Sequence, residues 1–105
     1  MISAVFTAKG NTLTGFEISG HSDYSEQGSD IICAAVSSAA YMTANTLTDV
    51  QSLAAEITEQ DGLMKVSLSP KDAKAAEVVL NGFLLHLNAL SEQYKDYIKV
   101  KISEV

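Results

Sequence analysis

The chain has 105 residues, of which 47% are hydrophobic, and these values predict one globular domain over residues 1–105 with a core of its own. Its 13 acidic and 7 basic residues give a formal net charge of −6, and basic residues gather only at Lys95, Lys99 and Lys101, which argues against direct nucleic-acid binding. We expect no membrane span and no signal peptide, because no apolar run is long enough to cross a bilayer and no basic segment leads into one.

The first elements predicted along the chain are two strands that form a hairpin. Apolar residues alternate with others over 2–9 and again over 12–19, with Thr14, Phe16 and Ile18 expected on one face. Gly10-Asn11 between the strands is a turn dipeptide. A polar loop over residues 20–29 follows.

A helix is predicted next, over about residues 31–49. Ser29 or Asp30 is a suitable N-cap, since both side chains can accept hydrogen bonds from the first turn. The helix is rich in alanine and serine. Small side chains on many faces would let it lie close to a sheet, a second helix or another subunit.

The second half of the chain predicts another hairpin, a helix and a final strand. Leu53, Ala55 and Ile57 alternate with polar residues, and Asp61-Gly62 is a strong hairpin signal. A returning strand follows, and then a helix with Ser69 as its cap, Pro70 in its first turn and Asp72 in a pattern like a capping box. The apolar stripe of that helix is Ala73, Ala76, Leu80, Phe83, Leu84, Leu87, Leu90 and Tyr94. The last strand is expected to point Ile98, Val100 and Ile102 inward.

The predicted order ββαββαβ belongs to the α+β class. Two helices can pack on one face of a mostly antiparallel five-stranded sheet. Neither a linker nor a second domain is predicted.

His21 and Cys33 are the residues with the clearest chemical potential. They lie 33 − 21 = 12 positions apart, and Cys33 is the only cysteine in the chain. As the third residue of its helix, Cys33 would lie among free backbone N–H groups at the positive end of the helix dipole, which favours a reactive thiolate and can stabilise an oxyanion. His21 could act as general base and then as general acid. Ser37, one turn after Cys33, would share its helix face.

Simpler interpretations of these residues remain open on this reasoning. A cysteine on an alanine-rich helix is often a small core residue, and a histidine in a polar loop is often only solvated. Asp30 has a sufficient role as a helix cap. His21, Asp23, Asp30 and Cys33 are metal-ligand types, but a single cysteine at this spacing is not typical of a metal site, so none is predicted.

The motif around these residues resembles a known family. Gly20-His21 is followed by Gly28-Ser29-Asp30-Ile31-Ile32-Cys33-Ala34-Ala35-Val36-Ser37, and the ribosomal-processing cysteine protease (Prp) family carries a Gly-His, a short loop and then G-x-D-I-V-C-A-A-V-S. Length, element order and motif position agree over the whole chain. Ser22, Ser25 and Ile32 depart from the residues common in that family, and none of these changes removes a catalytic group.

The resemblance implies a cysteine endopeptidase that removes the N-terminal extension of a large-subunit ribosomal protein, L-twenty-seven, during ribosome maturation. It makes Cys33 the nucleophile and His21 the general base, with Gly20, Asp30 and Ser37 at supporting positions. The flexible active-site loop would consist of Ser22, Asp23, Tyr24, Ser25, Glu26, Gln27, Gly28 and Ser29. The substrate would carry bulky apolar residues before the cut and a small residue after it.

The resemblance also implies a homodimer in the cytoplasm, without a cofactor, whose partner is the precursor of that ribosomal protein. A single cysteine is compatible with this reducing compartment. Tyr24 and Tyr41 are candidates for substrate contact. The alternatives are a non-catalytic module that binds a ribosomal protein and a small-molecule regulatory domain.

Overall fold

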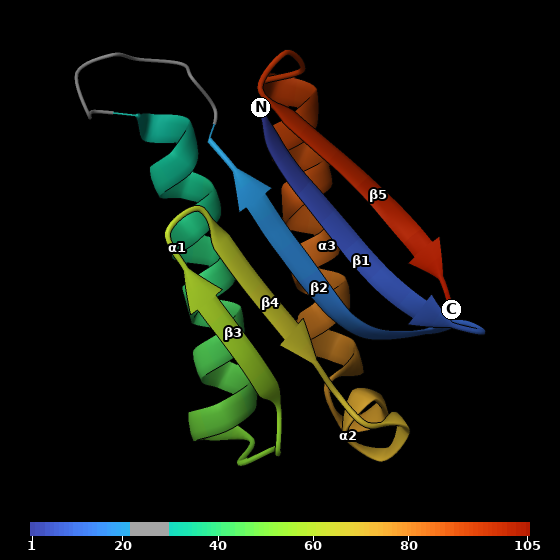
Figure 1. Ribbon diagram of the computed structural model, residues 1–105. Helices are drawn as coiled ribbons and strands as arrows, with labels where there is room; N and C mark the ends of the chain where they lie inside the picture. Colours follow the sequence, from blue (N-terminus) through green and yellow to red (C-terminus); the bar gives the residue numbers. More distant parts are fainter. Residues whose placement is uncertain (22–29) are drawn as a thin grey trace.

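The structure, a computed structural model, describes residues 1–21 and 30–105 and is built on a five-stranded sheet (Figure 1). The strands are β1 (Ile2–Lys9), β2 (Thr12–Gly20), β3 (Glu56–Gln60), β4 (Leu63–Ser67) and β5 (Ile98–Glu104). They are arranged in the order β3-β4-β2-β1-β5. Only the β1–β5 pair is parallel, so the predicted α+β fold with a mostly antiparallel sheet is confirmed.

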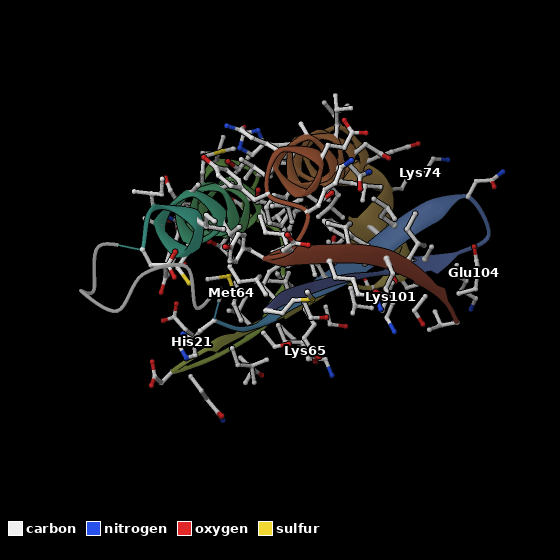
Figure 2. All side chains as sticks on the ribbon, turned by 90° about the horizontal axis from the view of Figure 1, so that it is seen from above. His21, Met64, Lys65, Lys74, Lys101 and Glu104 are labelled. Atoms are coloured by element: carbon white, nitrogen blue, oxygen red, sulfur yellow. The ribbon has the colours of Figure 1, made fainter. Side chains whose placement is uncertain are left out.

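The helices lie on one side of this sheet, as Figure 2 shows from above. They are α1 (Ile31–Asn45), which continues into a π-helical turn at Thr46–Val50, α2 (Pro70–Ala75) and α3 (Glu77–Gln93). Helices α1 and α3 run side by side across the sheet, and α2 lies at the end of β4 (Figure 1). The prediction of two helices on one face is therefore correct for the two long helices.

The continuous helix predicted after Ser69 is wrong at one point. Ala76 leaves helical geometry with φ −88° and ψ 0°, which separates α2 from α3. Ala73, Ala76 and Leu80 are all fully buried across this break. The apolar pattern runs on through the break, so the pattern by itself does not reveal it.

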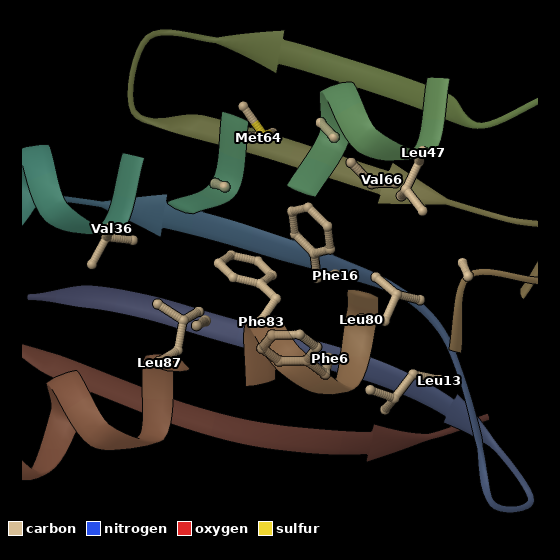
Figure 3. Close-up of a cluster of buried hydrophobic side chains, with 14 of the residues drawn as sticks. Phe6, Leu13, Phe16, Val36, Leu47, Met64, Val66, Leu80, Phe83 and Leu87 are labelled. Carbon is tan, nitrogen blue, oxygen red and sulfur yellow. The ribbon is translucent and has the colours of Figure 1, made fainter. Parts of the chain in front are cut away.

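Aromatic side chains form the centre of the core between the sheet and α3 (Figure 3). The ring centroids of Phe6 and Phe16 are 6.0 Å apart, and the Phe83 ring from α3 lies 5.4 Å and 4.9 Å from them. Such tilted and edge-on pairs add to the gain from burying the rings. The alternation predicted for β1 is confirmed, since Ile2, Ala4, Phe6 and Ala8 are all buried.

A bulge in β2 makes the prediction of which side chains face the core wrong at Thr14. Ala8 pairs with Leu13 and Thr7 pairs with Gly15, so Thr14 is the extra residue between them. Leu13 is 5% exposed and takes the buried position that was predicted for Thr14. Side chains along a strand alternate between its two faces, so one extra residue reverses the alternation on one side of the bulge.

The two edge strands are more exposed than predicted. Strand β3 begins at Glu56 and all of its side chains are exposed, while Leu53 and Ala55 precede it. Ile102 in β5 is 53% exposed although it was expected to face inward. The helices cover the central strands, so apolar side chains that alternate along an edge strand are not necessarily buried.

The helical segment Ile31–Val50 is 20 residues long with a mean hydropathy of 1.2, values that a membrane-spanning helix can also reach. In this fold Ile32, Val36, Ala40 and Leu47 are at most 2% exposed and pack within the core. Packing within the core therefore accounts for these four apolar residues of the helix.

Candidate active site

A cavity of about 440 Å³ lies where the end of β2, the first turns of α1 and the turn between β3 and β4 meet. His21 and Cys33, the predicted pair, both line it, together with Gly20, Ser37 and Tyr41. His21 lies on the sheet side of the molecule (Figure 2), and Cys33 is contributed by α1. The fold thus brings the two chemically significant residues to one cavity.

Cys33 is the third residue of α1, as predicted, and it is half-buried. It packs against the core and also faces the cavity. Ser37 and Tyr41 follow at intervals of four residues, and side chains at this spacing share one helix face. The thiol is therefore accessible from the cavity and is not simply a core residue.

Asp30 caps α1, which decides between the two predicted caps. Its Oδ1 accepts hydrogen bonds from the backbone N–H groups of Ile32 and Cys33, each at 3.0 Å. The expectation of free N–H groups around the sulfur is wrong at these two positions, because a carboxylate occupies both donors. An oxyanion at Cys33 would need other donors or a movement of Asp30.

Gly20 fixes the backbone that leads to His21. Its φ is +89°, and a Cβ at this position would overlap the carbonyl oxygen of Met1. A side chain is therefore excluded for two reasons, backbone conformation and space. Gly20 therefore fixes the path of the chain into His21, and its role in the activity stays a prediction.

The β3–β4 turn is part of the cavity wall, which the sequence did not predict. Glu59, Gln60, Asp61 and Gly62 line the cavity. Asp61-Gly62 was identified only as a turn, and no local sequence signal links it to His21. The two segments meet through sheet pairing, with the Gly20 N–H donating to the Gly62 carbonyl at 3.0 Å.

Tyr41 connects α1 to this hairpin. Hydrogen bonding to the Glu59 carboxylate, with smaller contributions from desolvation and the carboxylate charge, raises the pKa of Tyr41. Tyr41, a predicted substrate-contact candidate, lines the cavity.

The other predicted site residues belong to the predicted active-site loop. Outside the described residues lie Ser22, Asp23, Tyr24, Ser25, Glu26, Gln27, Gly28 and Ser29. Within 1–21 and 30–105, no group of three or more His, Cys, Asp or Glu side chains is placed to hold a metal ion.

Comparison with known proteins decides the family. The family model described as cysteine protease Prp matches residues 1–99. The chain belongs to this family. It is accordingly a cysteine protease, a hydrolase of the ribosomal-processing type.

Two relatives illustrate the similarity in sequence. The ribosomal processing cysteine protease Prp of Bacillus subtilis (strain 168) is 26% identical over 94 residues, which cover 84% of each chain. The protein of the same name from Staphylococcus aureus (strain Mu50 / ATCC 700699) is 26% identical over 90 residues, covering 84% of this chain and 85% of its own.

Solved structures share the fold. The essential ribosomal processing protease Prp from S. aureus, in complex with a covalently linked product peptide, superposes with a TM-score of 0.90 at 24% identity, covering 98% of this chain and 100% of its own. The crystal structure of SMU.848 from Streptococcus mutans superposes with a TM-score of 0.81 at 30% identity, covering 100% of this chain and 96% of its own.

Proposed function

We propose that this protease removes the N-terminal extension of the large-subunit ribosomal protein L-twenty-seven during ribosome maturation, with Cys33 as nucleophile and His21 as general base. The observation that carries the proposal is the placement of both residues on one cavity at the start of α1. The relatives' names as ribosomal processing proteases support the class of substrate.

The reaction follows from the chemistry of a thiol and an imidazole. His21 takes the proton of Cys33, and the thiolate sulfur bonds to the scissile carbonyl carbon. The tetrahedral intermediate collapses as His21 gives the proton to the leaving amine, which leaves a thioester on Cys33. Water, deprotonated by His21, then attacks the thioester and releases the trimmed N-terminal peptide, and the proton returns to the thiol.

The surrounding residues support these steps. Asp30 holds the first turn of α1 in place through its two cap bonds. Gly20 sets the backbone before His21, and Ser37 lines the cavity one turn beyond Cys33, where it can bond the substrate or the imidazole. No cofactor is required for this chemistry.

We further propose that the enzyme acts in the cytoplasm as a homodimer. The single cysteine suits a reducing compartment. Exposed apolar side chains on the helix side, Met42 of α1 (57%) and Leu85 of α3 (73%), support a subunit contact there. Size-exclusion chromatography with light scattering measures the mass, and a monomer at micromolar concentration would contradict the dimer.

The decisive experiment compares the native protein with Cys33→Ala on a peptide that spans the extension, with products identified by mass spectrometry. We expect a single cut after bulky apolar residues and before a small residue, and a rate at least about 10⁴-fold lower in the variant. Ser69→Ala is the control, since Ser69 caps α2 and does not line the cavity.

Two outcomes contradict the proposal in different ways. Cleavage that persists in Cys33→Ala assigns the reaction to another residue. Binding of the peptide by the native protein without any cut favours the alternative, a non-catalytic module that binds a ribosomal protein.

A further inference from the structure

The turn between β3 and β4 touches His21 from two directions. A Cβ added at Gly62 would lie 3.1 Å from Nε2 of His21, 3.6 Å from Cε1 and 3.9 Å from Cδ2, so the tip of the imidazole lies against this glycine. The Gly62 carbonyl also accepts the hydrogen bond from Gly20, the residue directly before His21. The turn therefore contacts both the ring and the backbone that carries it.

The hairpin that bears this turn is itself fixed relative to Cys33. Strand β4 pairs with β2 up to Ser19 and Leu63, next to the turn. Glu59 in β3 interacts with Tyr41 across the cavity that both line, and Tyr41 lies on the same face of α1 as Cys33. The hairpin thus connects the helix of the predicted nucleophile with the strand end of the predicted base.

We propose that Gly62 is a positioning residue for the catalytic imidazole, and that the β3–β4 turn sets the place of His21 relative to Cys33. This inference rests on the proposed roles of His21 and Cys33. A methyl group at this position would press on the ring, and the imidazole would have to move by a few tenths of an ångström. Displacements of catalytic groups of this order reduce the rate strongly, since reacting atoms must be aligned closely.

The chain offers a matched control for this glycine. Gly10 lies in the β1–β2 turn with φ +65°, close to the +72° of Gly62, but a Cβ at Gly10 would have no atom within 4 Å. Alanine therefore introduces the same backbone strain at both positions and a contact with His21 only at Gly62. A difference in kcat between the two variants therefore results from the contact of residue 62 with His21.

We expect Gly62→Ala to lower kcat for the peptide about tenfold with little change in KM, and Gly10→Ala to stay within about twofold of the native rate. Both variants should lose a similar amount of thermal stability. The Asn variants of the same two glycines are the second pair, because asparagine tolerates a positive φ better than alanine does. Equal kcat values for the two alanine variants would overturn the proposal.

Two measurements separate this inference from the proposed function. Alkylation of Cys33 by iodoacetamide should be slower in Gly62→Ala than in the native protein, but Gly62→Ala should have no effect in a His21→Ala background. In NMR spectra, the ring protons of His21 should move in Gly62→Ala while those of His86, the second histidine, stay in place. If the native protein cuts no peptide but these effects appear, the cleavage proposal fails and the positioning role stands. An alkylation effect that persists without His21 refutes the positioning role.

Discussion

Removal of the Asp30 carboxylate tests how the start of α1 is held. Asp30→Ala deletes two hydrogen bonds of 3.0 Å to Ile32 and Cys33. Loss of an N-cap usually costs about 1 kcal/mol, and loss of a negative charge at a helix N-terminus about 0.5 kcal/mol more. The free energy of unfolding should fall by about 1.5 kcal/mol, which lowers Tm by about 6 °C in a domain of this size.

Asp30→Asn separates the two contributions. The amide oxygen can still accept the cap bonds, so only the charge is lost and Tm should fall by about 2 °C. In Asp30→Ala iodoacetamide should also alkylate Cys33 faster, because the turn that carries the thiol is no longer held by the two cap bonds, whereas Asp30→Asn, which keeps these bonds, should stay near the native rate. Thermal unfolding followed by circular dichroism and a timed alkylation assay give the two readouts.

Ser69→Ala is the control for this reasoning. Ser69 caps α2 with one bond of 3.2 Å to the Asp72 N–H, and neither residue lines the cavity. Its loss should lower Tm by about 4 °C or less and leave the alkylation rate of Cys33 unchanged. If Asp30→Ala melts at the native temperature, or if Ser69→Ala changes the reactivity of Cys33, this account of the cap is wrong.

Two further predictions concern the core and the cavity wall. Phe83→Ala removes a ring that is 3% exposed and contacts two other rings. Urea denaturation should show that the free energy of unfolding falls by about 3–5 kcal/mol. A fall of less than about 1 kcal/mol would contradict this packing. Glu59→Gln should bring the raised pKa of Tyr41 back toward 10.0, measured by tyrosinate absorbance against a Tyr41→Phe blank. The pKa of Tyr41 is higher in the folded than in the unfolded protein, so its contribution to stability is present below about pH 10 and is lost as pH rises through the folded-state pKa. An unchanged titration of Tyr41 in Glu59→Gln would exclude the interaction between the two side chains.

The elements themselves could be predicted because they depend on local interactions. Alternation over 2–9, the Asp61-Gly62 turn and the cap at Asp30 each express a preference of neighbouring residues for one backbone geometry. The place of Cys33 as third residue of α1 follows directly from that cap. The family motif lies in the same stretch, so the candidate pair of His21 and Cys33 was also accessible from sequence.

Contacts between distant segments decided the features of the fold and the site that the sequence did not predict. The break at Ala76, the bulge at Thr14 and the exposure of Ile102 depend on how the helices and strands pack, and the local pattern is the same whether or not they occur. The meeting of Gly62 with His21 depends on the pairing of β4 with β2. The sequence by itself therefore determined the elements and the reactive residues, whereas only the tertiary structure decided what surrounds His21, because pairing and packing join residues that no local preference relates.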